Sequence, residues 1–129
     1  MVFAHVSVRT GSMEKSILFY EKYFGMKLAF RKGIPETNSE IAFLESPGLE
    51  FRLELTWYKS QVKFEQAGYD DRTFDHIAFI VKNQSELLDR MRKEGVTITD
   101  MPYTTPSGSK IAFIEDPFGT LIELIERKE

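Results

Sequence analysis

The chain of 129 residues contains no cysteine, and this absence removes whole classes of chemistry. Without thiols there is no disulfide, no cysteine nucleophile and no thiolate metal site, so any metal ion must be held by His, Asp or Glu. The formal net charge is only −3, and no basic cluster provides an electrostatic footprint for nucleic acid or an acidic membrane. No apolar run approaches the roughly 18 residues of a membrane span, and the first residues lack a signal-peptide pattern. We therefore expect a cytoplasmic protein that binds neither nucleic acid nor membrane.

The strongest positive signal is an internal repeat. Three pairs of segments recur at offsets of 69 to 71 residues: "HVSV" (5–8) with "HIAFIV" (76–81), "IAFLESPG" (41–48) with "IAFIEDPFG" (111–119), and "LEL" (53–55) with "IEL" (122–124). Such self-similarity indicates two copies of one structural module. We predict a single domain made of module one (1–56), a connector (57–73) and module two (74–129).

Both modules show the same order of expected elements. In module one we expect a strand at 3–9, a helix at 13–24 that is capped by Ser12 and stopped by Gly25, and strands at 27–32, 40–45 and 50–57. In module two we expect a strand at 76–81, a helix at 86–94 capped by Ser85 and stopped by Gly95, and strands at 96–100, 110–116 and 120–126. The prediction is an α+β fold: two tandem βαβββ modules forming a cup-shaped, partly closed eight-stranded mixed sheet, with the helices outside.

Polar residues occupy one face of the strands that would line this cup. Side chains alternate along a strand, so Glu54 lies opposite the leucines beside it, and Glu123 lies opposite Ile122 and Leu124. The only two histidines, His5 and His76, begin the first strand of each module.

Two histidines and two glutamates that point into one cup form a symmetric ligand set for a divalent metal. The alternative is a buried ion-pair network without metal, in which Arg9 and Arg52 neutralise the two carboxylates.

At these residues the chain resembles the vicinal-oxygen-chelate superfamily, which includes glyoxalase, bleomycin resistance and dioxygenase proteins, and within it glyoxalase I (lactoylglutathione lyase). The resemblance covers about residues 5–125 through "HVSVR", "EKSILFYEKYFGMKL", "LELT", "HIAFIV" and "IAFIEDPFGTLIELI". It implies one divalent metal ion per site, nickel or cobalt before zinc or manganese, with the ligands His5, Glu54, His76 and Glu123. It also implies a homodimer, and it leaves open whether each site closes within one chain or across two.

The same resemblance implies an enzyme of methylglyoxal detoxification. Its substrate would be the hemithioacetal of methylglyoxal and a thiol, expected to be glutathione, which is isomerised to an S-lactoyl thioester by proton transfer through an enediolate. A divalent cation can polarise the two vicinal oxygens, and a carboxylate can act as the base. We favour Glu123 as the principal base, assisted by Glu54. Arg9 matches the family arginine that contacts the glutamyl carboxylate, whereas Tyr58 replaces the family Asn and leaves the thiol open.

Other members of the same fold provide the alternatives. An acyl-CoA epimerase of the methylmalonyl-CoA type would need a second base, for which Glu36 or Glu40 is a candidate. A non-catalytic antibiotic-binding resistance module would lack the ligand quartet. Extradiol dioxygenases and fosfomycin-type thiol transferases use two His and one Glu, so Glu54 argues against both.

Overall fold

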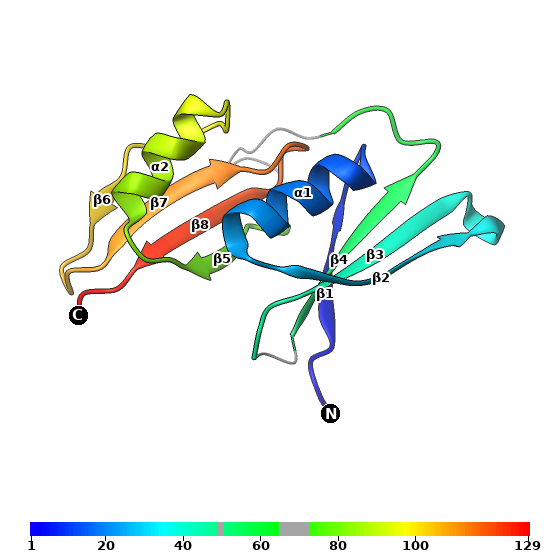
Figure 1. Cartoon of the computed structure of the whole chain (residues 1–129), viewed down its shortest axis with the longest axis horizontal. Helices are drawn as coiled ribbons and strands as arrows, with labels where there is room; N and C mark the ends of the chain where they lie inside the picture. The colour runs from blue at the N-terminus through cyan, green and yellow to red at the C-terminus, as the bar shows by residue number, and fades with distance from the viewer. Residues whose placement is uncertain (49–50, 65–72) are drawn as a thin grey trace. The chain divides into compact units, whose positions relative to one another are not determined.

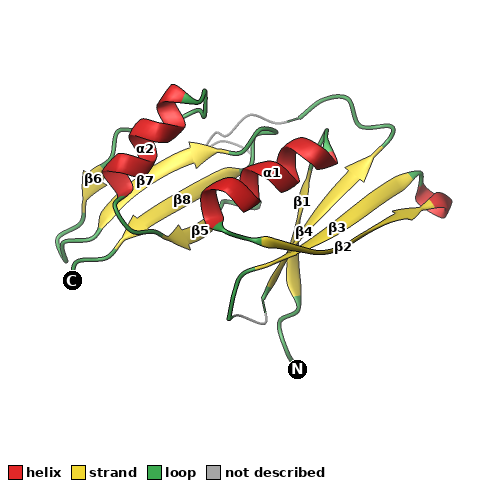
Figure 2. Ribbon diagram, in the orientation of Figure 1, coloured by secondary structure: helices red, strands yellow, loops and turns green. Residues whose placement is uncertain are grey.

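The computed structural model describes residues 1–48, 51–64 and 73–129, and the chain divides into two compact units, Met1–Phe64 and Glu65–Glu129 (Figure 1). The described residues form two α-helices and two four-stranded mixed sheets, one helix and one sheet in each unit (Figure 2). The predicted α+β class with two copies of one module is confirmed. The cup and the single domain stay predictions, and part of the predicted connector lies outside the described residues.

Unit one has the element order that the sequence predicts. Its elements are β1 (His5–Arg9), α1 (Met13–Phe24), β2 (Lys27–Ile34), a 3-10 turn (Pro35–Thr37), β3 (Ser39–Glu45) and β4 (Arg52–Tyr58). The strand order is β1-β4-β3-β2, with β1 parallel to β4 and the other pairs antiparallel. The first and last strands of the module are therefore neighbours.

Helix α1 begins and ends at the predicted residues. The Ser12 side chain accepts a hydrogen bond from the Lys15 N–H, and Gly25 adopts the left-handed conformation (φ 62°) that ends the helix. The helix packs on β4 and β2, with Tyr20 fully buried together with Leu55 of the sheet. Each such buried apolar side chain contributes roughly 1.5–3 kcal/mol. This packing leaves the polar face of β1 and β4 turned away from the helix.

Unit two repeats this topology. Its elements are β5 (Ile77–Ile80), α2 (Gln84–Lys93), β6 (Tyr103–Thr104), β7 (Lys110–Glu115) and β8 (Leu121–Glu126), with strand order β5-β8-β7-β6. Strand β5 is parallel to β8, and α2 packs on β8.

The predicted strand at 96–100 is wrong. Only one isolated bridge forms in this segment, between Ile98 and Ile114, and the edge strand is β6 instead. Pro102 follows shortly afterwards and cannot donate a backbone hydrogen bond, which interrupts a continuous ladder.

The predicted N-cap of α2 is also wrong. Ser85 lies inside the helix, and the capping position is Asn83, whose φ is 53° and whose side chain makes no capping bond. A carboxylate from the last strand acts instead, because Glu126 Oε2 accepts from the Gln84 N–H at 2.8 Å. The buried Gln84 side chain then donates to the carbonyls of Lys110 (3.0 Å) and Leu124 (2.9 Å). These bonds fix α2 to β7 and β8.

The "EDPFG" segment is the turn between β7 and β8. Asp116 Oδ1 accepts from the N–H groups of Phe118 (2.8 Å) and Thr120 (2.9 Å), and Gly119 has φ 88°. This turn sets the register in which Phe113 lies opposite Glu123.

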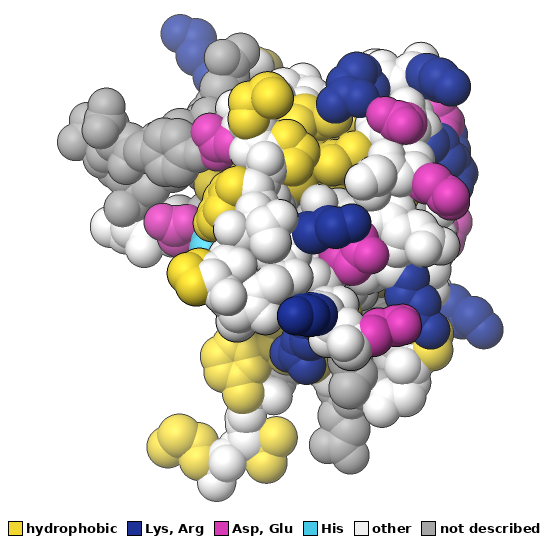
Figure 3. Space-filling view, turned by 90° about the vertical axis from the view of Figure 1, so that its left-hand side faces the viewer, with side chains coloured by type: hydrophobic (Ala, Val, Ile, Leu, Met, Phe, Trp, Pro, Cys, Tyr) yellow, Lys and Arg dark blue, Asp and Glu magenta, His cyan; other side chains and the backbone are white. Residues whose placement is uncertain are grey.

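No helix among the described residues is long and apolar enough to cross a bilayer. On the face drawn in Figure 3, acidic and basic side chains are interspersed with hydrophobic ones.

Candidate functional site

Unit one places His5 and Glu54 on neighbouring parallel strands. His5 Nε2 lies 3.6 Å from Glu54 Oε2, and the Glu54 side chain is only 16% exposed. The His5 ring meets the Phe43 ring edge to face, with centroids 5.0 Å apart and planes at 89°. Phe43 lies opposite Glu54 in the register of β3 and β4, so all three side chains share one face of the sheet.

Two hydroxyls hold the other oxygen of Glu54. Ser7 is the direct neighbour of Glu54 on β1, and its Oγ lies 2.9 Å from Glu54 Oε1. Thr56 Oγ1 is also 2.9 Å from Oε1, and the two hydroxyl oxygens are 2.7 Å apart. One carboxylate oxygen therefore faces the hydroxyls while the other faces the histidine.

Unit two contains the equivalent pair in a tighter contact. His76 Nε2 lies 2.8 Å from Glu123 Oε2, and Glu123 is 18% exposed. The His76 ring meets Phe113 edge to face at 5.4 Å and 85°. On its other side, His76 Nδ1 lies 2.6 Å from Asp75 Oδ1.

The structure thus repeats a His, a Glu and a Phe in the same arrangement in each unit. The sequence predicted the two histidines and the two glutamates on the polar strand faces, and the structure brings them together as one pair per unit. Sequence reasoning assigned no role to Phe43, Phe113 or Asp75. The two phenylalanines were visible as the repeated "IAF" in both modules.

The donor set of each pair fits a divalent metal ion. A neutral imidazole has one N–H and one lone pair, so His76 cannot donate to both Asp75 and Glu123. With Nδ1–H directed at Asp75, the lone pair of Nε2 and a carboxylate oxygen face each other, and this contact needs a proton or a cation between them. Imidazole nitrogen with carboxylate oxygen suits first-row transition metals, and a carboxylate on the remote nitrogen is the usual partner of a ligating histidine.

No group of three or more His, Cys, Asp or Glu side chains gathers as a metal site within the residues that the structure describes. Each unit by itself therefore offers one imidazole nitrogen and one carboxylate to such an ion.

Among the described residues, neither arginine of the alternative ion-pair network pairs with Glu54 or Glu123. Arg52 pairs with Glu45 at 2.7 Å instead of Glu54. Arg9 stacks on the Tyr58 ring at 4.1 Å and donates to Gln61 Oε1 at 3.0 Å. Arg9, predicted to bind the substrate carboxylate, is held beside the residue that replaces the family Asn.

Neither candidate for the second base of an epimerase lies on the face of Glu54. Glu40 lies three residues before Phe43 on a regularly paired strand, so it projects from the opposite face, where it forms an ion pair with Arg31. Glu36 is exposed in the 3-10 turn.

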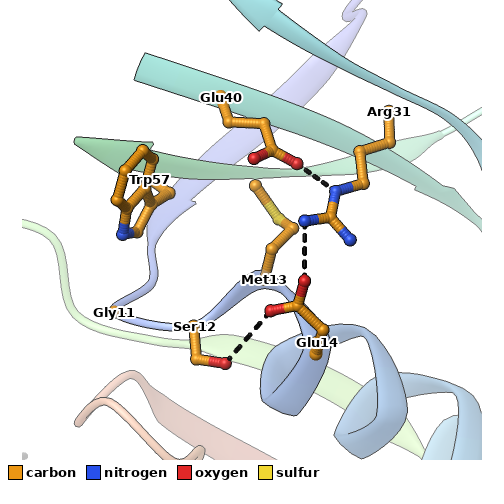
Figure 4. Close-up of a pocket in the computed structure, with 7 residues that line it drawn as sticks. All are labelled: Gly11, Ser12, Met13, Glu14, Arg31, Glu40 and Trp57. Atoms are coloured by element: carbon orange, nitrogen blue, oxygen red, sulfur yellow. Dashed lines mark hydrogen bonds and ion pairs between the residues drawn. The ribbon is translucent and has the colours of Figure 1, made fainter. Parts of the chain in front are cut away.

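Arg31 and Glu40 belong to a pocket on the helix side of the unit-one sheet. The pocket has a volume of about 290 Å³ and is lined by Gly11, Ser12, Met13, Glu14, Arg31, Glu40 and Trp57 (Figure 4). Arg31 also bonds Glu14 at 2.8 Å, which holds the pKa of that carboxyl below its usual value, while the hydrogen bonds to Glu40 and Glu14 raise the pKa of Arg31. Both carboxylates of this pocket, Glu14 and Glu40, therefore form ion pairs with Arg31.

Comparison with known proteins identifies the family of the chain. Residues 2–124 match the family described as Glyoxalase/Bleomycin resistance protein/Dioxygenase superfamily. A lactoylglutathione lyase of Escherichia coli O157:H7 is 36% identical over 132 residues, covering 100% of this chain and 95% of its own length. A lactoylglutathione lyase of Arabidopsis thaliana is 36% identical over 97% of this chain, but the chain spans only 44% of that relative's length.

Solved structures give the same result. The trypanothione-dependent glyoxalase I of Leishmania major superposes with a TM-score of 0.79 at 33% identity, covering 98% of this chain and 86% of the other. The glyoxalase I of Zea mays has a TM-score of 0.79 at 32% identity and covers 98% of this chain and 44% of the other. The resemblance inferred from the sequence is confirmed. The chain belongs to the glyoxalase/bleomycin resistance protein/dioxygenase superfamily, and relatives that match it over its whole length include lactoylglutathione lyases.

Proposed function

We propose that the protein is a metal-dependent lyase of the lactoylglutathione lyase type, which isomerises the hemithioacetal of methylglyoxal and a thiol to an S-lactoyl thioester. The observation that carries this proposal is the repeated His–Glu pair, one in each unit, on the first and last strands of the module. The whole-length similarity to lactoylglutathione lyases supports the choice of reaction within the superfamily.

His5, Glu54, His76 and Glu123 are the proposed ligands of one divalent cation, with nickel or cobalt preferred and zinc or manganese as alternatives. When bound, the cation supplies positive charge to the two neighbouring oxygens of the substrate, as a Lewis acid and as a template. Phe43 and Phe113 orient the imidazole rings by their edge-to-face contacts, and Asp75 fixes the ring of His76. We also propose that the active form is a homodimer.

Glu123 is the proposed principal base. It removes the carbon-bound proton of the hemithioacetal and returns it to the neighbouring carbon, while the hydroxyl proton passes from the first oxygen to the second, so that the substrate is isomerised without an oxidant or reductant. Glu54 assists as the second carboxylate, from the opposite side of the substrate. The proton is thus moved by the carboxylate that makes the shorter contact with its histidine, 2.8 Å against 3.6 Å.

Arg9 is the proposed contact for a carboxylate of the thiol cosubstrate. One N–H of its guanidinium donates to Gln61, and the guanidinium has further N–H groups that can donate to a carboxylate. Stacking on the Tyr58 ring limits the motion of the side chain. Glutathione is the proposed thiol because the relatives of matching length are named lactoylglutathione lyases.

A metal titration tests the proposal. The apo-protein is titrated separately with nickel, cobalt, zinc and manganese, and both bound metal and turnover of the methylglyoxal–glutathione adduct are measured. We expect one metal ion per set of four ligands and activity that appears with binding. Absence of activity with every metal would refute the proposal, and turnover of methylmalonyl-CoA alone would replace it with an epimerase.

A further inference from the structure

The two equivalent glutamates have different hydrogen-bond surroundings. In unit one, Ser7 is the β1 neighbour of Glu54, and Thr56 follows two residues later on the same strand face. In unit two, the β5 neighbour of Glu123 is Ala78, and the residue two positions later is Ile125. Neither of these two side chains has a hydroxyl. The glutamate is therefore present in both units, but the two hydroxyl donors are present only in unit one.

The hydroxyl protons of Ser7 and Thr56 are sufficient to keep at least one hydrogen bond on Glu54 Oε1. Ser7 and Thr56 have one O–H each, and three close contacts connect the two hydroxyls with Glu54 Oε1. If one hydroxyl donates to the other, the second still has its own proton to donate to Glu54. Every arrangement that uses both protons within this group therefore leaves at least one charge-assisted hydrogen bond on Oε1.

Glu123 has no equivalent restraint. Within the residues that the structure describes, its only polar side-chain contact is with His76, through Oε2. Within the described residues, Glu123 Oε1 therefore has no hydroxyl donor of the kind that Glu54 Oε1 has, and only Oε2 is in contact, with His76.

We infer that Ser7 and Thr56 are positioning residues that lock Glu54 as a fixed ligand, and that their absence around Glu123 leaves that carboxylate free to move the proton. This inference rests on the proposed function and deepens it. It assigns the difference between the two glutamates to two side chains that do not themselves contact the reacting atoms.

Removal of the hydroxyls is the first test. The double variant S7A/T56V deletes both donors and keeps the strand shape, and T56S keeps a hydroxyl at the second position. We expect S7A/T56V to bind nickel about 10-fold more weakly in a chelator competition, because supporting contacts to a ligand typically contribute about 10- to 100-fold in affinity. T56S and the surface control T104V on β6 are expected to bind nickel as the unmodified protein does.

Transfer of the hydroxyls is the second test. The variant A78S/I125T builds the same two donors beside Glu123, and thermal unfolding verifies that both double variants are folded. We expect kcat for the methylglyoxal–glutathione adduct to fall at least about 10-fold, because the carboxylate must then break charge-assisted hydrogen bonds in order to move with the proton. Nickel affinity is expected not to weaken.

Both shifts are required. Unchanged nickel affinity in S7A/T56V, or unchanged kcat in A78S/I125T, would overturn the inference while the unmodified protein still binds metal and turns over substrate. An unmodified protein that does neither would overturn the proposed function as well, so the two failures are distinguishable.

Discussion

His76 and Glu123 lie on neighbouring parallel strands with Nε2 and Oε2 2.8 Å apart, whereas the equivalent atoms of His5 and Glu54 are 3.6 Å apart. The two units therefore contain the same His–Glu pair, but the distance between the two side chains differs. In unit one the glutamate is bonded to hydroxyls, and in unit two the histidine is bonded to a second carboxylate.

This difference predicts unequal effects when each glutamate is changed to glutamine. E123Q removes the proposed principal base, so we expect kcat to fall by about 10²- to 10⁴-fold. Both glutamates are proposed ligands, but only Glu54 is held in place by hydroxyls, so we expect E54Q to lose more metal affinity than E123Q does. Steady-state kinetics and metal competition assays measure both, and E86Q on the exposed face of α2 is the control. Equal losses of kcat in the two variants would contradict the assignment.

Asp75 is predicted to matter although it lies at the surface. Its Oδ1 contacts His76 Nδ1 at 2.6 Å, which directs the lone pair of Nε2 toward Glu123. We expect D75N to weaken metal binding by about 10-fold, because a carboxylate behind a histidine ligand fixes its tautomer. D89N, which disrupts only an exposed ion pair on α2, is expected to have no effect. The same metal affinity for D75N and D89N would refute this role.

The buried amide of Gln84 is predicted to stabilise unit two. Q84A leaves the carbonyls of Lys110 and Leu124 without their donor, so we expect the free energy of unfolding to decrease by about 1–3 kcal/mol. S85A, at the exposed neighbouring position, is expected to change it by less than about 0.5 kcal/mol. Urea denaturation of both variants measures the difference. A larger effect of S85A would restore Ser85 as the helix cap.

The ion pair of Glu14 and Arg31 is predicted to lose its contribution to stability as the pH falls. The hydrogen bond from Arg31 lowers the pKa of Glu14 from its ordinary value of 4.5. Since this pKa is lower in the folded chain, the contribution to stability is complete above pH 4.5 and is lost as the pH falls through the folded-state value. An NMR titration of the Glu14 carboxyl is expected to show the low pKa, and R31Q is expected to return it toward 4.5. Titration of Glu14 at 4.5 in the unmodified protein would contradict the ion pair.

The sequence predicted those features that depend on local signals or on the repeat. Ser12 and Gly25 were recognised as helix boundaries because a capping residue and a left-handed stop act within one turn. The strand faces of Glu54 and Glu123 followed from alternation along the strand.

The features that were missed depend on residues distant in sequence. Glu126 caps a helix that begins 42 residues earlier, so no local window contained the signal. Arg31 neutralises Glu40 across two antiparallel strands, and which cation would pair with this carboxylate could not be read from a local pattern. The hydrogen-bond partners of Arg9 likewise could not be read from a pattern along the chain.

The parallel pairing of the first strand with the last has a consequence for folding. His5 and Glu54 are 49 residues apart, and His76 and Glu123 are 47 residues apart, so each pair joins the two ends of its module. Contacts of such long sequence separation cost the most loop entropy and form late. We therefore expect each His–Glu pair to be completed after the hairpins of its own unit are in place, so that a partly folded chain presents the proposed ligands to a divalent cation separately, without a formed site.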